Sequence, residues 1–148
     1  MKAAVIHAFG GPEVLKIEEI ARPVPAPGEV LVKLHAVGIN PIDYKTRQGA
    51  GANRRWKETK FPVILGWDVS GVVEESNDAA WKRGDEVFAL SRYPQPGGGY
   101  AEYAAVPSAE LVAKPQSLDH VHAAAVPMAA LTAWQAIFDK AGLSAGNS

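Results

Sequence analysis

Three polar side chains that could do chemistry lie within five residues: Asn40, Asp43 and Tyr44. The Asn40 amide offers two hydrogen-bond donors and one acceptor. Pro41 can open a short helix at 41–48, because a first turn does not need the proline N–H. Tyr44 then lies one turn behind Asn40, so both side chains can face one cleft. The Tyr44 phenol could bind a substrate oxygen or donate a proton.

Each of these residues also has a structural alternative. Asn40 could cap the helix, and Tyr44 could be a packing residue. Asp43 is expected to hold loop backbone.

Metal ligands are scarce in this chain of 148 residues. It contains no cysteine, which excludes disulfides and any metal site built on thiolates. Of its four histidines, only His120 and His122 lie close together, at an expected helix start where their rings point to different sides. The sequence therefore predicts no metal site, and these two histidines are interpreted as solvated residues of a first helical turn.

The composition excludes several classes of partner. Hydrophobic residues make up 47% of the chain and charged residues 21%, which is ordinary for a globular protein. Fifteen Lys and Arg against sixteen Asp and Glu give a net charge of -1, so we expect no broad surface for nucleic acid or an anionic membrane. No segment approaches the roughly 18 apolar residues of a membrane span. A cytoplasmic location is the resulting expectation.

The elements that must position these side chains are mostly short strands. Fourteen glycines and eleven prolines interrupt β-type runs, a pattern typical of an irregular β-barrel or sandwich. Alternation of apolar and polar residues and turn signals predict strands at 2–7, 14–20, 30–37, 68–74, 86–90 and 100–106. Trp67 precedes one of these strands and could wall a substrate cleft, although a large aromatic residue is more often part of a core.

The pattern becomes helical towards the C-terminus. Ser117 is expected to cap a helix that runs to about residue 126, where Pro127 interrupts it. The pattern at 128–140 predicts a second helix. Most faces of this helix are apolar, so it should be buried. The predicted organisation is a domain at 1–126 and a linking helix at 127–148.

Five segments carry a resemblance to a known family, in the family's order: VGINPIDY at 37–44, PVILGWDVSGVV at 62–73, GDEV at 84–87, GGYAEY at 98–103 and AAAVPMAALTAW at 123–134. Together they resemble the medium-chain dehydrogenase/reductase superfamily, in its zinc-free quinone oxidoreductase (zeta-crystallin-like) branch. The resemblance implies a mainly β, GroES-like distorted barrel with short helices and C-terminal helices. The Rossmann domain that follows it in the family is absent from this sequence, which we interpret as a fragment.

The resemblance also implies roles for individual residues. Asn40 would lie against the nicotinamide and the substrate, with Tyr44 as a second catalytic residue. Thr132 would contact the nicotinamide, unless its hydroxyl bonds back to a helix carbonyl. In zinc-dependent relatives a cysteine stands at the position of Asn40 and a histidine at that of Trp67, and neither residue found here replaces them as a zinc ligand.

The function expected from these features is hydride transfer, without zinc, by an NADPH-dependent quinone or enone oxidoreductase. NADPH is the expected cofactor of the intact enzyme, but this chain lacks a phosphate-binding turn and should bind it weakly. The partner is a small-molecule quinone or enone, and a homo-oligomer is compatible with the resemblance. The alternative is a non-catalytic GroES-like structural or binding module.

Overall fold

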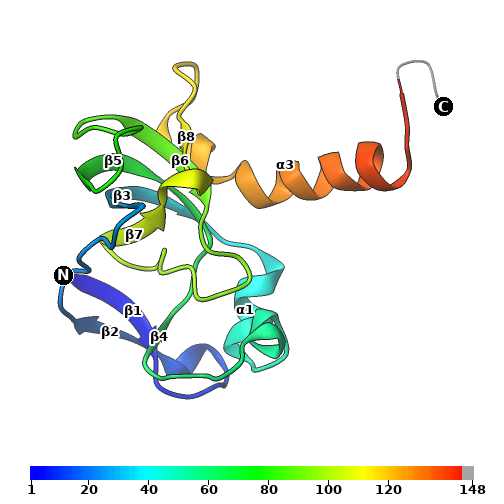
Figure 1. Cartoon of the computed structure of the whole chain (residues 1–148). Helices are drawn as coiled ribbons and strands as arrows, with labels where there is room; N and C mark the ends of the chain where they lie inside the picture. The colour runs from blue at the N-terminus through cyan, green and yellow to red at the C-terminus, as the bar shows by residue number, and fades with distance from the viewer. Residues whose placement is uncertain (145–148) are drawn as a thin grey trace.

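The computed structural model describes residues 1–144, which form two antiparallel sheets with one helix projecting from their side (Figure 1). The strands of the smaller sheet are β1 (Lys2–Ile6), β2 (Leu15–Glu19) and β4 (Val63–Ile64), in the order β2-β1-β4. Those of the larger sheet are β3 (Glu29–Gly38), β5 (Asp68–Ser76), β6 (Glu86–Leu90), β7 (Tyr103–Pro107) and β8 (Val112–Ala113), in the order β7-β3-β5-β6-β8. The mainly β, GroES-like fold expected from the sequence is confirmed.

The larger sheet is irregular because its central strands are kinked. β3 pairs with both β5 and β7, and its register against β5 shifts between Leu31 and Val32 and again between Leu34 and Ala36. Such shifts bend a strand and increase its twist. An isolated bridge between Ala3 and Ala101 joins the smaller sheet to the segment before β7. These features give the distorted barrel.

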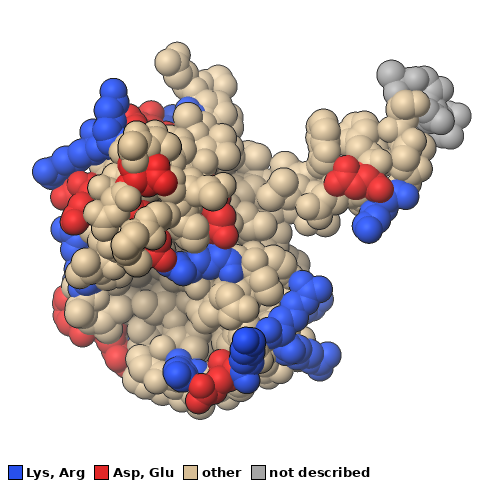
Figure 2. Space-filling model, viewed as in Figure 1, with Lys and Arg blue, Asp and Glu red and all other residues tan. Residues whose placement is uncertain are grey.

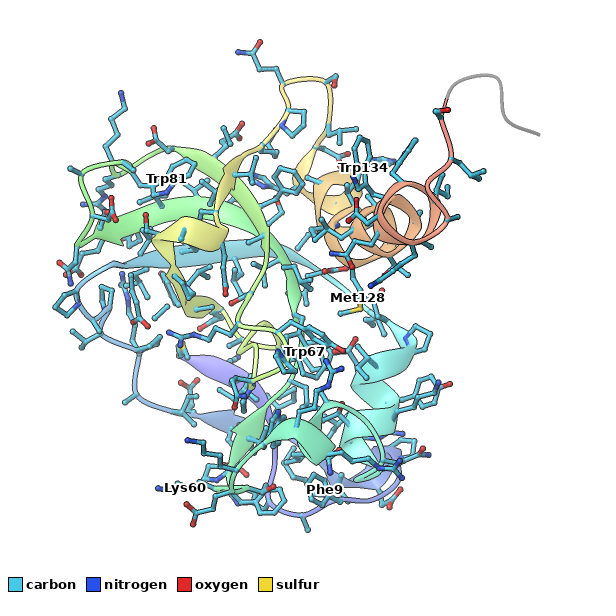
Figure 3. All side chains as sticks on the ribbon, turned by 45° about the vertical axis from the view of Figure 1, so that its right-hand side comes forward. Phe9, Lys60, Trp67, Trp81, Met128 and Trp134 are labelled. Atoms are coloured by element: carbon cyan, nitrogen blue, oxygen red, sulfur yellow. The ribbon has the colours of Figure 1, made fainter. Side chains whose placement is uncertain are left out.

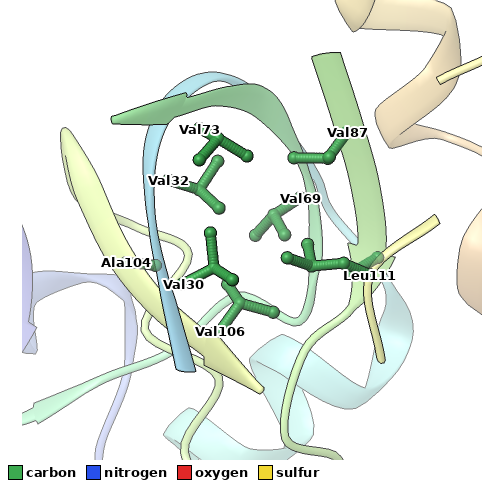
Figure 4. Packing of buried hydrophobic residues seen from close by; sticks show 9 residues of the cluster. Val30, Val32, Val69, Val73, Val87, Ala104, Val106 and Leu111 are labelled. Carbon is green, nitrogen blue, oxygen red and sulfur yellow. The ribbon is translucent and has the colours of Figure 1, made fainter. Parts of the chain in front are cut away.

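Two hydrophobic clusters hold this arrangement together. Figure 4 shows the first cluster, which lies inside the curve of the larger sheet and consists of Val30, Val32, Val69, Val73, Val87, Ala89, Ala104, Val106 and Leu111. The second cluster is buried around Trp67 and also contains Ile6, Ala52, Val63 and Leu65. Each valine that is fully buried contributes on the order of 1.5–3 kcal/mol. The second cluster matters most for function, since Ile42 and Met128 pack against it.

Short helices connect the strands. They are the 3₁₀ turns η1 (Pro12–Val14), η2 (Ala52–Arg55) and η3 (Ser108–Glu110), and the α-helices α1 (Pro41–Arg47) and α2 (His120–Ala124). The expectation that Ser117 caps α2 is wrong. Asp119 is the cap, because its side chain accepts the backbone N–H of His122 at 2.8 Å. Leu118 lies between Ser117 and that cap, and its N–H closes a turn on Pro115.

The last helix projects away from both sheets. α3 (Pro127–Trp134) continues into a π-helical segment, η4 (Gln135–Lys140), and both appear as an arm in Figure 1. Figure 2 shows an arm without charged residues until its far end. Our expectation that this helix is buried is wrong for the described chain, because Leu131 is 44% exposed and Trp134 60%. Among the described residues, no helix is long and apolar enough to cross a membrane.

Candidate active-site groove

A groove of about 580 Å³ lies between the start of α1 and one side of α3 and η4. It is lined by Asn40, Pro41, Ile42 and Lys45 from the first segment and by Met128, Ala129, Thr132, Ala133 and Ala136 from the second. Figure 3 shows Met128 where the two helices approach each other, close to the cluster around Trp67. Segments almost ninety residues apart in the sequence therefore form one site.

Asn40 is held in place by two carboxylates. Its backbone N–H donates to Asp43 Oδ2 at 2.7 Å, as part of a capping box at the start of α1. Its side-chain Nδ2 donates to Asp68 Oδ2 at 2.9 Å. An amide nitrogen carries two hydrogens, so the second remains for a ligand in the groove. Asn40 is therefore both the N-cap residue of α1 and a lining residue of the groove.

Asp68 connects this amide to α3. Its carboxylate is 1% exposed and accepts both Asn40 Nδ2 and the backbone N–H of Met128, the latter at 3.0 Å. Burial raises the pKa of the Asp68 carboxyl above its usual range, and the two hydrogen bonds oppose that rise. One buried side chain thus fixes the groove wall on both sides.

Asp43 is a second buried carboxylate that accepts two backbone N–H groups, one of them from Asn40. It is 3% exposed and accepts the N–H groups of Asn40 and Gly66, the second at 3.2 Å. Burial raises the pKa of this carboxyl as well, against the effect of its hydrogen bonds. The structure supports the expectation that Asp43 holds loop backbone.

Thr132 lies in the same groove as Asn40. Its hydroxyl makes no hydrogen bond with the described residues, so the alternative of a bond back to a helix carbonyl is not found. The groove therefore presents two uncharged hydrogen-bonding groups, the Asn40 amide and the Thr132 hydroxyl, between apolar walls.

The structure does not bring the other two predicted residues into this groove. Tyr44 is 47% exposed and lines a separate cavity. Trp67 is fully buried, and its Nε1 donates to the carbonyl of Gln95 at 2.6 Å. The structure corrects the expectation that Trp67 lines an open cleft, because its ring belongs to the core beneath the groove.

Lys45 and Met128 were missed by the sequence analysis. Of the described residues that line the groove, Lys45 is the one with a charge. Lys45 lies four residues after Pro41 on α1, and this helical spacing could have placed Lys45 on the same side of the helix as Pro41. Met128 gave no comparable signal, because its part in the site depends on the hydrogen bond to Asp68.

Within residues 1–144, no glycine-rich turn joins a strand to the start of a long helix. A phosphate turn needs glycines between a strand and the N-terminus of a long helix. A Cβ on Gly97 would lie 2.1 Å from the carbonyl oxygen of Gly66, so this glycine permits close packing of two loops. The described residues also contain no group of three or more His, Asp or Glu side chains suited to a metal ion.

Comparisons with known proteins show the family of this chain. A family model described as the alcohol dehydrogenase GroES-like domain matches residues 26–116. Quinone oxidoreductase from Homo sapiens is 38% identical over 151 residues, which cover 100% of this chain and 44% of that protein. The structure of the quinone oxidoreductase from Coxiella burnetii superposes with a TM-score of 0.90 at 37% identity, covering 99% of this chain and 47% of the other.

A third relative was solved with a ligand. The quinone oxidoreductase from Thermus thermophilus, whose structures include a complex with NADPH, has a TM-score of 0.76 and 35% identity. The match covers 96% of this chain and 41% of that one. The chain thus spans less than half the length of these relatives.

Proposed function

Because the chain belongs to the alcohol dehydrogenase GroES-like domain family of the medium-chain dehydrogenase/reductase superfamily, we propose that it is the substrate-binding part of an NADPH-dependent quinone or enone oxidoreductase. The observation that carries this proposal is the groove in which the Asn40 amide and the Thr132 hydroxyl lie between apolar walls. The names of the relatives and the NADPH complex of one of them support the substrate class and the cofactor.

NADPH supplies a hydride when it is bound. Asn40 would donate its remaining Nδ2 hydrogen to a carboxamide or substrate carbonyl oxygen, held in that orientation by Asp68. Thr132 would hold a second polar atom. The apolar side chains of the groove would exclude water, which strengthens these hydrogen bonds.

Lys45 lines the groove and brings a positive charge to it. Reduction of a quinone or an enone leaves an oxyanion on the product, and a nearby ammonium group stabilises it. The ammonium group can also donate a proton to that oxygen. The catalytic role of Tyr44 stays a prediction that Tyr44→Phe tests.

We propose that this reaction proceeds without zinc. The positions where zinc-dependent relatives carry a cysteine and a histidine are Asn40 and Trp67 here, and the first already donates to Asp68. Metal analysis of the intact protein after treatment with a chelator should find no stoichiometric zinc. About one retained zinc per chain would contradict this part of the proposal. The cytoplasmic location and a homo-oligomeric state also stay predictions.

An activity assay of the intact protein tests the proposed function. We expect NADPH oxidation that depends on 1,4-benzoquinone or on cyclohexenone. The 148-residue chain alone is the control, and it should neither turn over nor bind NADPH tightly. An intact protein that binds NADPH but reduces neither acceptor would contradict the proposal and favour the structural or binding module.

A further inference from the structure

A second cavity, of about 200 Å³, shares no lining residue with the groove. Its walls come from α1, from β2 and from three loops, and they consist of Leu15, Ile39, Asp43, Tyr44, Arg47, Leu65 and Tyr100. Most of this surface is aliphatic or aromatic. Arg47 and Asp43 are its charged residues, and the proposed reaction uses neither of them directly.

The Arg47 guanidinium has no partner among residues 1–144. Its Nε is buried without a hydrogen-bond acceptor, and no carboxylate of the described chain forms an ion pair with it. Arg92, another partly buried arginine, shows the usual arrangement: Nε donates to the Ala105 carbonyl at 3.0 Å and the guanidinium pairs with Glu29. Arg47 is half-buried, and its Nε is the atom that is both buried and without an acceptor. A buried N–H without an acceptor is unfavourable unless a ligand supplies one.

Asp43 cannot serve as that partner, although it lies one turn before Arg47 on α1. Its two oxygens accept the backbone N–H groups of Asn40 and Gly66. The Tyr100 hydroxyl also lies against this carboxylate and stabilises its charge. The carboxylate of Asp43 therefore holds the loop and the start of the helix, and Arg47 remains unpaired.

We propose that this cavity binds a small planar carboxylate with an apolar body, such as an aromatic acid. The planar fork of an arginine matches a carboxylate and can bind both of its oxygens. The rings of Tyr44 and Tyr100 and the side chain of Leu65 offer surfaces for a flat apolar body. The cavity exceeds the roughly 150 Å³ that is known to hold a benzene molecule.

Benzoate is the probe that tests this site, and the 148-residue chain is sufficient for the experiment. In an NMR titration we expect saturable binding in the millimolar range, as for other very small ligands. The signals that shift should be those of Ile39, Tyr44 and Leu65. Benzamide has the same shape without the charge and should bind at least about tenfold more weakly.

Arg47→Gln should weaken benzoate binding by about tenfold or more, and Lys45→Gln should leave it unchanged. Lys45 is the matched control because it is a cation of the same helix that faces the groove instead. Thermal melts show whether each variant folds. If Arg47→Gln does not fold, Arg47→Lys keeps the charge without the planar fork and should show an intermediate affinity.

Three results would overturn the proposal. They are no saturable benzoate binding to the unmodified chain, equal affinity for benzoate and benzamide, and shifts at Met128 and Thr132 in place of the cavity residues. The last result would mean that the ligand enters the groove. Activity of the intact protein is a separate measurement, so the failure of this site leaves the proposed reaction standing.

Discussion

Asn40 and Asp68, 28 residues apart, are joined by a hydrogen bond of 2.9 Å between the amide nitrogen and a carboxylate oxygen. The other oxygen of Asp68 accepts the backbone N–H of Met128 at the start of α3. The carboxylate therefore sets the distance between the two helices that form the groove.

The first prediction concerns Asp68. Asp68→Ala leaves two donors, on Asn40 and Met128, without their acceptor in a buried site. Each unsatisfied buried group costs about 1–3 kcal/mol, so we expect a loss of roughly 2 kcal/mol or more in the free energy of unfolding. Urea denaturation measures it.

The matched control is Glu75→Ala, which changes an exposed carboxylate on the same strand, β5. It should alter stability by no more than about 0.5 kcal/mol. Equal, small effects of both substitutions would show that Asp68 does not hold the groove together.

The second prediction is a pH dependence that originates at His120. The interpretation of this residue as solvated is wrong, because its side chain is only 15% exposed. Its ring stacks on His35 with centroids 4.5 Å apart, and its Nδ1 lies 2.8 Å from Ser70 Oγ. Burial, with His35 as a second cause, lowers the pKa of His120 below 6.5, although Glu86 opposes the shift. The folded protein therefore favours the neutral ring.

A histidine with a lowered pKa in the folded state contributes stability above the unfolded pKa of 6.5, and this contribution is lost as the pH falls below that value. The difference in unfolding free energy between wild type and His120→Gln should therefore shrink from pH 7.5 to about pH 5. Because Asp43 and Asp68 titrate in both proteins, their effects cancel in this difference. His35→Gln should weaken the pH dependence, and a difference that is constant with pH would refute the account of His120.

The third prediction is that the 148-residue chain self-associates through its exposed arm. Leu131, Trp134, Ile137 and Phe138 are each at least 42% exposed, and the rings of Trp134 and Phe138 lie 4.5 Å apart. An apolar surface of this kind favours contact with another protein surface. Sedimentation velocity should show mass that increases with concentration.

Replacing Leu131 and Trp134 together by Glu should reduce this association. Ile17→Glu is the control, since Ile17 is 73% exposed but lies on β2 in the smaller sheet. A wild-type chain that stays monomeric throughout the concentration series, or one that responds equally to both changes, would contradict the prediction.

The sequence predicted the strands well because their signals are local. Alternation of apolar residues in β3 and the turns between strands depend on near neighbours, and the structure confirms them. The five family segments also indicated the fold class. The start of α2 was misplaced by two residues because Ser117 and Asp119 are both good caps, and only tertiary packing selects between them.

The composition of the groove was harder to predict. Asn40 and Thr132 do share it, but Trp67 is core and Tyr44 lines another cavity. Helical spacing can place Asn40 and Tyr44 one turn apart, yet it does not say which side each presents to α3. The unpaired guanidinium of Arg47 is invisible in the sequence, because it depends on where every carboxylate lies.

The central claim is that Asn40 and Thr132 position the reacting groups, and kinetics of the intact protein with NADPH and a quinone test it most directly. We expect Asn40→Ala and Thr132→Val each to lower kcat/KM by a few-fold to about tenfold, the value of one or two uncharged hydrogen bonds. Melting temperatures must accompany the rates, because Asn40→Ala also removes a helix cap worth about 1 kcal/mol. Tyr44→Phe in the same assay tests the separate prediction of a catalytic role for Tyr44, and this substitution should lower kcat/KM by a few-fold to about tenfold. Unchanged kcat/KM in both groove variants, with their melting temperatures unchanged, would contradict the claim.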